Sequence, residues 1–202
     1  MTAPLSRSDT HPAFISVENL SKRFGDKYVL EDVNLHLPKG ETMAIIGPSA
    51  AGKSVLMKCL VGIYGADSGH IFLEGDDVSQ TNAPKRFEWA ERIGMLFQHN
   101  ALFDSLKVWE NICFRQIELG TMSRKAAKEH AIDLLGLVGL ATESADLTPN
   151  DLSGGMQKRV GVARAISTDP SILLLDNPTA GLDPVLSNHI ERIIGKIAEQ
   201  LG

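Results

Sequence analysis

The sequence predicts an α/β fold, and three successive patterns predict it. Alternating apolar residues typical of strands occupy residues 14–46, and a helical pattern occupies residues 101–141. The last part of the chain has a short apolar run followed by a longer amphipathic segment. With 202 residues, the chain is long enough for one domain, or for one domain with a lobe inserted in it.

Strands are predicted mainly in the first part of the chain, where aliphatic and β-branched residues alternate between turns. The predicted strands are FISVENL (residues 14–20), KYVLEDVNLHL (27–37), TMAIIG (42–47), HIFLEG (70–75) and RIGMLF (92–97).

Helices are predicted in the middle of the chain. Asp104 or Ser105 can cap a helix over residues 105–119, and Ser123 can cap another over residues 124–140. The second of these helices has a continuous apolar face, formed by Ala127, Ala131, Leu134 and Leu135.

The last part of the chain predicts a helix, a strand and a further helix. The glycine pair Gly154 and Gly155 begins the first of these helices, and Pro184 begins the second. Between them, the run SILLLD (171–176) is apolar on both faces, which is typical of a buried parallel strand.

The composition narrows the class of protein. The net charge is −5, with 25 acidic and 20 basic residues, so a general attraction to nucleic acid is not indicated. Cys59 and Cys113 lack metal-ligand spacing and are expected in the core of a protein from a reducing compartment. Residues 1–13 are expected to be a disordered leader, and no run approaches the roughly 18 apolar residues of a membrane span.

The segment GPSAAGKS fits the phosphate-loop pattern GxxxxGK[ST]. It follows the predicted strand at 42–47 and precedes a helical stretch, SVLMKCLVGI. Glycines turn backbone N–H groups toward a phosphate, the lysine neutralises its charge and the hydroxyl ligates Mg²⁺. A glycine-rich structural turn is the alternative. The candidate residues are Gly47, Pro48, Ser49, Ala50, Ala51, Gly52, Lys53 and Ser54.

Two further segments support a nucleotide site when they are considered together with this loop. Asp176 ends the apolar run ILLLD, where a carboxylate can hold Mg²⁺ at the carboxyl end of a strand or can simply cap the strand. LSGGMQ (152–157) is a capped helix start, in which Ser153, Gly154 and Gly155 expose backbone N–H groups that suit a γ-phosphate.

The segment LSGGMQKR, with Ser153 lying 23 residues before Asp176, resembles the signature of ABC ATPases. The resemblance covers residues 14–202. It implies a P-loop NTPase with a RecA-like core, an antiparallel β subdomain and a helical subdomain at about 99–170. It also implies ATP and Mg²⁺ as cofactors, and a dimer in which each ATP lies between the phosphate loop of one subunit and the signature of the other.

The same resemblance assigns roles to further residues. Gln98 matches the glutamine that contacts Mg²⁺ and the attacking water, so Ser54, Gln98 and Asp176 are the implied metal ligands. Phe24 matches an aromatic that stacks on adenine, although an ordinary core or turn phenylalanine is nearly as good an interpretation. Gln157 belongs to the signature, and Asp183, in AGLDP, matches a residue that works across the dimer interface.

A narrower resemblance concerns residues 95–114, MLFQHNALFDSLKVWENICF. This sequence is similar to that of ATP-binding subunits of Mla or Mce-type transporters, which move phospholipids or other lipids across the bacterial envelope. It implies integral membrane permease subunits and a periplasmic lipid-binding Mce-type protein as partners. The implied location is peripheral, at the cytoplasmic face of the inner membrane.

The sequence departs from the family at two places. The family has glutamate directly after the aspartate that Asp176 matches, where this chain has Asn177, and an amide cannot accept a proton from water at neutral pH. General-base assistance is worth about 10² to 10⁴ in rate, so we expect ATP to bind normally and turn over slowly. Asn177 is either a natural variant that hydrolyses by another route or a substitution that traps the ATP-bound dimer.

The second departure is at the end of the sequence. The family continues with a further strand and a switch histidine, so we expect this sequence to be cut short at Gly202. The function that these residues predict is the ATP-binding subunit of an ABC transporter, with lipid as cargo. Two alternatives remain open: a soluble ABC ATPase of the DNA-repair or translation type, and a catalytically silent nucleotide-binding partner.

Overall fold

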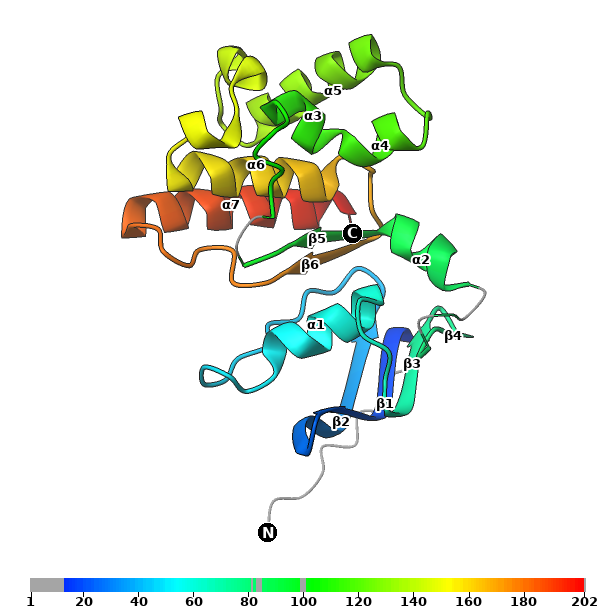
Figure 1. Ribbon diagram of the computed structural model, residues 1–202. Coiled ribbons are helices and arrows are strands. Elements are labelled where there is room, and N and C mark those ends of the chain that lie inside the picture. Colours follow the sequence, from blue (N-terminus) through cyan, green and yellow to red (C-terminus); the bar gives the residue numbers. More distant parts are fainter. Residues whose placement is uncertain (1–12, 81, 83–84, 99–100, 202) are drawn as a thin grey trace. The chain divides into compact units, whose positions relative to one another are not determined.

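The structure is a computed structural model that describes residues 13–80, 82, 85–98 and 101–201. Within that part of the chain, the residues fall into two compact units, one that ends at Phe87 and one that comprises Glu88–Leu201. The first unit contains the phosphate loop, and the second contains Gln98, the signature and Asp176. Figure 1 labels the elements of both units.

The first unit is built on an antiparallel sheet. Its strands have the order β2-β1-β3-β4, so β1 lies between β2 and β3 and pairs with both. Three of the predicted strands are thereby confirmed. The strands are β1 (Ala13–Phe24), β2 (Lys27–Pro38), β3 (Ser68–Leu73) and β4 (Asp76–Asp77).

Helix α1 (Lys53–Val61) follows the phosphate loop and packs near β2. It buries Leu56, Cys59 and Leu60. The carboxyl end of α1 is closed by Gly62, in the left-handed conformation, and by the buried guanidinium of Arg86, which donates to the carbonyls of Cys59 and Leu60. A cation at this end also interacts favourably with the helix dipole.

The predicted strand at residues 42–47 is wrong. Residues 41–48 have no strand assignment, and the side chain of Ile46 is 91% exposed. A strand exists only through hydrogen bonds to a neighbouring strand, and within the first unit the described ladders involve only β1 to β4. The apolar composition of TMAIIG was therefore not sufficient to predict its pairing.

The second unit has a parallel pair, β5 (Ile93–Leu96) and β6 (Ile172–Leu175), with Ile93 opposite Ile172 and Leu96 opposite Leu175. Both strands were predicted. Helix α2 (Arg86–Arg92), which was not predicted, leads into β5. Between β5 and β6 along the chain lie α3 (Val108–Ile112), α4 (Phe114–Glu118), α5 (Arg124–Leu137) and α6 (Gly154–Ile166), with 3₁₀ turns at Thr142–Asp146 and Pro149–Asp151.

The predicted cap and buried face of α5 are confirmed, although the helix ends at Leu137 and not at residue 140. The hydroxyl of Ser123 accepts a hydrogen bond from the backbone N–H of Ala126, and the buried residues of the helix are Ala127, Ala131, Leu134 and Leu135. The helical pattern after β6 is confirmed as α7 (Pro184–Leu201), which buries Ile190, Ile193 and Ile197. In Figure 1, α6 and α7 lie side by side above the β5–β6 pair.

The helix expected to begin at Asp104 or Ser105 begins later, with Lys107 as its N-cap. The buried side chain of Asn111 explains the difference. Its amide donates to the carbonyls of Phe103 and Leu106 and accepts from the N–H of Phe103, so it holds residues 103–106 as a loop. The helix also ends at Cys113, where α4 begins a separate turn.

One close approach fixes the position of α6 against the strand pair. A Cβ atom placed on Gly94, in β5, would collide with the backbone oxygen of Ala165 in α6 and would lie 2.9 Å from Cγ of Pro170. Only glycine therefore allows the helix and the strand to lie this close.

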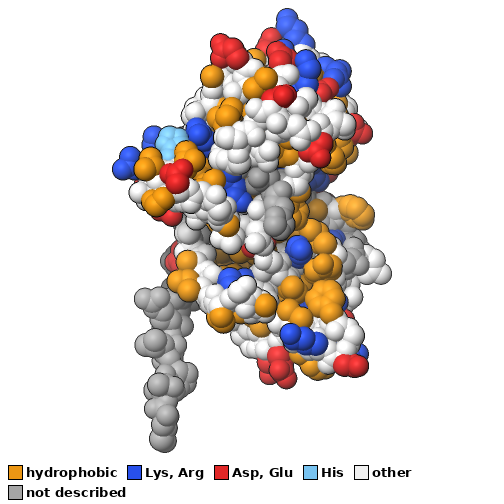
Figure 2. All heavy atoms as spheres, turned by 60° about the vertical axis from the view of Figure 1, so that its left-hand side comes forward, with side chains coloured by type: hydrophobic (Ala, Val, Ile, Leu, Met, Phe, Trp, Pro, Cys, Tyr) orange, Lys and Arg blue, Asp and Glu red, His pale blue; other side chains and the backbone are white. Residues whose placement is uncertain are grey.

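Helix α5 and the neighbouring turns carry charges of both signs on their outer side. Figure 2 shows blue and red side chains mixed at the upper end of the molecule, where these helices lie. Asp146 accepts from Lys128 at 2.7 Å and from Lys107 at 3.3 Å. A mixed, exposed set of charges is typical of a solvated face.

Three remaining predictions concern the whole chain. Cys59 and Cys113 are both buried free thiols, as expected. The predicted leader, residues 1–13, lies outside the described residues apart from Ala13, which starts β1. Among the described helices, none has the combination of length and apolar character that a membrane span requires.

Candidate functional site

The phosphate loop of the first unit leads into a helix, as its sequence predicts, although no strand directly precedes it. The ammonium group of Lys53 donates to the carbonyls of Gly47 and Pro48 at 2.8 and 2.7 Å, so it lies over the loop that these residues begin. Helix α1 starts at Lys53, and its first N–H groups therefore face the same loop. A positive side chain and a positive helix end converge on one short segment.

Gly52 is required by the backbone of this loop. Its φ of 91° lies in the left-handed region, and a Cβ atom there would lie 2.7 Å from the carbonyl oxygen of Val29. Ala50 also has a left-handed φ, of 63°, which is an unfavourable conformation for alanine. The other loop residues, Pro48, Ser49 and Ala51, are exposed.

Phe24 lies in the same unit as the loop, at the end of β1. Its ring is 43% exposed, lies edge-on to Tyr64 with centroids 5.2 Å apart, and has the ammonium of Lys22 5.6 Å from its centroid. It is therefore not a core residue. An exposed aromatic face of this kind can stack on a planar ligand.

In the second unit, Gln98 and Asp176 lie at the same edge of the parallel pair. Leu96 and Leu175 end β5 and β6 opposite each other, and the N–H of Asp176 donates to the carbonyl of Leu96 at 2.9 Å. Asp176 is 6% exposed, whereas Gln98 is exposed. The carboxyl edge of a parallel sheet is where ligands of α/β proteins bind.

Asn177 follows Asp176 with a φ of 55°, in the left-handed region. Asparagine tolerates this conformation better than most residues that have a side chain. Its carbonyl accepts from the N–H of Ala180 at 3.2 Å, which closes a turn after β6. The local backbone thus gives Asn177 a conformational reason to be present, beside any chemical one.

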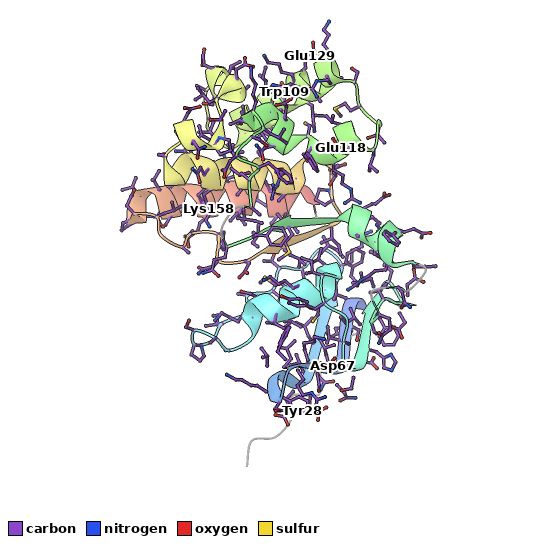
Figure 3. The ribbon with its side chains drawn as sticks, in the orientation of Figure 1. Tyr28, Asp67, Trp109, Glu118, Glu129 and Lys158 are labelled. Carbon is purple, nitrogen blue, oxygen red and sulfur yellow. The ribbon has the colours of Figure 1, made fainter. Side chains whose placement is uncertain are left out.

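Lys158 is a residue of this edge that the sequence did not single out. It lies on the second turn of α6 (Figure 3), is 3% exposed, and donates from Nζ to the carbonyl of Gln98 at 2.8 Å. Burial lowers the pKa of Lys158, and the negative charge of Asp176 acts in the opposite direction. The available signal in the sequence was a lysine on the same side of α6 as the apolar residues Val162 and Ala165, which follow it at helical spacing.

The signature forms a capped helix start, as expected. The hydroxyl of Ser153 accepts from the N–H of Met156 at 3.3 Å, and both Ser153 and Gly154 are exposed. Gly155 is buried, and a Cβ atom there would lie 2.9 Å from Cδ1 of Leu186 in α7. The amide of Gln157 donates to the carbonyl of Pro149 at 2.8 Å, so it holds the turn before the helix.

Asp183 caps α7. Its carboxylate accepts from the N–H groups of Val185 and Leu186 at 2.9 and 3.0 Å, and Pro184 occupies the first position of the helix. This is a complete structural role within one chain. The implied role of Asp183 across a dimer interface stays a prediction.

Comparison with known proteins decides the family. The family model described as "ABC transporter" matches residues 30–180. The chain belongs to the ABC transporter family. A solved structure of the ATP-binding cassette MJ0796, described as dimeric and bound to ADP and Pi, is 30% identical and has a TM-score of 0.84, covering 92% of this chain and 83% of that one. The fold is therefore the ABC cassette fold of the P-loop NTPases, with mixed α and β structure, as the sequence predicted.

Curated ABC relatives carry names for several transported compounds. A probable ribonucleotide transport ATP-binding protein, mkl, of Mycobacterium bovis is 36% identical over 98% of this chain and 55% of its own length. The arginine transport ATP-binding protein ArtM of Bacillus subtilis is 38% identical over 92% of this chain and 76% of its own length. The chain spans about half the length of the first of these relatives.

Proposed function

We propose that this ABC protein binds ATP and couples its binding and hydrolysis to transport through membrane permease subunits. The observation that carries the proposal is the phosphate loop, in which Gly52, Lys53 and the start of α1 direct positive charge and N–H donors to one place. These donors suit the β- and γ-phosphates of ATP. Phe24, exposed in the same unit, is proposed to stack on the adenine.

The donors proposed for Mg²⁺ are the hydroxyl of Ser54, the amide oxygen of Gln98 and the carboxylate of Asp176. Mg²⁺ prefers oxygen ligands and is commonly held by one or two carboxylates together with substrate phosphates and waters. The described residues contain no group of three or more His, Cys, Asp or Glu side chains suited to a metal ion. A site with one carboxylate therefore fits an ion that is bound together with a nucleotide.

We also propose that a second copy of the chain completes the site. The exposed Ser153 and Gly154 at the start of α6 supply donors for the γ-phosphate of the partner's ATP. Gly155, Gln157 and Asp183 support this surface from within the chain, by packing, by holding the preceding turn and by capping α7. The related cassette MJ0796 is described as dimeric.

Nucleotide binding is tested by substituting two lysines of α1. Lys53→Met removes the cation over the loop, and Lys58→Met is the matched control, because Lys58 contacts the ring of Tyr64 instead. We expect the affinity for a fluorescent ATP analogue to fall at least tenfold in Lys53→Met, the size of effect of a lost charge-assisted bond, and to stay within about twofold in Lys58→Met. Equal affinities in the two variants would contradict the proposal.

The transporter and the soluble alternative differ in their partners. A transporter subunit co-purifies with an integral membrane protein after detergent solubilisation, as a peripheral protein of the cytoplasmic face of the inner membrane. A DNA-repair or translation ATPase does not. Recovery of the full-length protein in the soluble fraction, without a permease, would support the soluble alternative.

We propose lipid as the cargo, on the resemblance of residues 95–114 to Mla and Mce-type subunits. The relatives described above are named for ribonucleotide and arginine transport, so the cargo needs a direct test. The purified complex with its permease would be extracted and analysed for bound phospholipid by mass spectrometry. Co-purification of a periplasmic Mce-type protein would support lipid, whereas a periplasmic amino-acid-binding protein would contradict it.

A further inference from the structure

Lys158 joins three elements of the second unit at one point. Its ammonium, carried by α6, donates to the carbonyl of Gln98 at the end of β5, and the charge of Asp176 at the end of β6 acts on it. An ammonium that is 3% exposed costs free energy unless its charge and its donors are compensated. An apolar side chain would fill this place in the core without that cost, so the lysine points to a role for the bond itself.

A second cation of α6 acts on the same stretch of chain. Arg164 donates from Nη1 to the carbonyl of Ala101 at 2.7 Å. Ala101 has a left-handed φ of 50°, so its carbonyl direction is one that few residues adopt. The carbonyls of Gln98 and Ala101 thus each accept a hydrogen bond from a cation of α6.

We infer that Lys158 is a positioning residue, which holds the Gln98 turn on the helix that begins at Ser153 and directs the Gln98 side chain to the edge where Asp176 lies. The inference rests on the proposed function, in which the amide oxygen of Gln98 is a ligand of Mg²⁺. Fixing the carbonyl of Gln98 fixes the peptide plane that contains its Cα atom, from which the side chain projects. Lys158 acts on the metal only through Gln98.

The test uses three substitutions in the full-length protein. Lys158→Met keeps an unbranched side chain of similar shape but removes its donors, and Lys158→Arg keeps a charged donor. Arg159→Met is the matched control, because the neighbouring Arg159 also donates to a backbone carbonyl, that of Gly139 at 3.0 Å, away from Gln98. A fluorescent ATP analogue is bound first without metal and then during a titration with MgCl₂.

Lys158→Met is expected to raise the half-saturating Mg²⁺ concentration about tenfold, the size of effect of a lost charge-assisted hydrogen bond. Binding of the analogue in EDTA is expected to stay within about twofold, because the lost bond acts on the metal site only. Lys158→Arg and Arg159→Met are expected to leave the Mg²⁺ dependence within about threefold, since the first keeps a donor and the second spares Gln98.

A double substitution separates positioning from general stabilisation. If Lys158 acts through Gln98, the variant with both Lys158→Met and Gln98→Ala needs no more Mg²⁺ than Gln98→Ala alone. Additive losses, or an equal loss of binding in EDTA, would overturn the inference. Should Lys158→Met not fold, Lys158→Gln carries the same expectation, because its amide is one bond shorter and does not reach the carbonyl.

The same measurements distinguish this inference from the proposed function. If the unsubstituted protein does not bind the ATP analogue at all, the proposed function fails and the inference falls with it. If it binds the analogue and responds to Mg²⁺, but Lys158→Met responds in the same way, only the inference is overturned.

Discussion

Each unit contains a lysine whose ammonium group donates to the backbone, but the sequence separation between the lysine and its acceptor differs greatly. In the first unit, Lys53 is bonded to carbonyls six and five residues before it. In the second, Lys158 is bonded to a carbonyl 60 residues before it. The first arrangement is built by a local turn and can be read as a motif. The second exists only after α6 has packed against β5.

Because Lys158 reaches its acceptor only through the packing of α6 on β5, a substitution at that contact should have the largest effect on stability. Gly94→Ala places a methyl group against the backbone oxygen of Ala165, which cannot rotate away as a flexible side chain could. We expect the free energy of unfolding to fall by about 3 kcal/mol or more, as in severe overpacking. Urea unfolding of the full-length protein, followed by circular dichroism, measures the loss.

The control is Gly136→Ala, on α5 in the same unit, where a Cβ atom would meet nothing within 4 Å. Because alanine favours helix by about 1 kcal/mol relative to glycine, this variant should be slightly more stable than the unsubstituted protein. Equal stabilities for the two variants would show that the contact between β5 and α6 does not hold the second unit together.

The next effect concerns catalysis at the edge of the second unit. Asn177→Glu introduces a carboxylate that can accept a proton, and we expect the rate of ATP hydrolysis by the full-length protein to rise about 10²-fold. Asn177→Gln is the control, because it has the same length as glutamate but remains an amide. Both variants should lose about 0.5 to 1 kcal/mol of stability, because asparagine tolerates the left-handed φ of 55° better.

Steady-state ATPase rates under saturating Mg²⁺ and ATP give the comparison. If the glutamate and glutamine variants hydrolyse ATP at the same rate, then proton transfer at residue 177 does not limit turnover. A natural variant that uses another route would be the better interpretation in that case.

The sequence was informative where contacts are local. The turn at Gly52, the cap at Ser153 and the cap at Ser123 each involve residues within a few positions of one another, and all three were predicted. The role of Lys158 depends on tertiary packing that no local pattern encodes. The strand at 42–47 failed for the same reason, because its apolar pattern does not specify a hydrogen-bonding partner.

The pKa values of the two cysteines, one in each unit, give a second comparison. Burial raises the pKa of Cys113, in the second unit, to about 11. Burial also raises the pKa of Cys59, in the first, where the positive charges of Lys22 and Arg86 oppose the shift. An unfolded thiol has a pKa of about 8.5, so between that value and about 11 the unfolded chain binds fewer protons than the folded one.

Stability should therefore fall as the pH rises through this window, by about 2 kcal/mol between pH 8 and pH 10 for Cys113. Urea unfolding at several pH values measures the slope, with Cys113→Ala and Cys59→Ala as the comparison. The slope should flatten more in Cys113→Ala. A larger flattening in Cys59→Ala would mean that the cations near Cys59 do not offset its burial.

The smallest expected effect concerns two residues whose φ lies in the left-handed region, one in each unit. Ala50, in the phosphate loop, has a φ of 63°, and Asp169, after α6, has a φ of 51°. Glycine relieves about 1 kcal/mol of strain for alanine but also costs about 0.5 to 1 kcal/mol of chain entropy. Ala50→Gly should therefore stabilise the protein by at most about 0.5 kcal/mol, whereas Asp169→Gly should be neutral or destabilising, because aspartate already tolerates this conformation. Thermal unfolding resolves the sign, and a destabilised Ala50→Gly would show that the loop at Ala50 gains more from a restricted unfolded chain than it loses to strain.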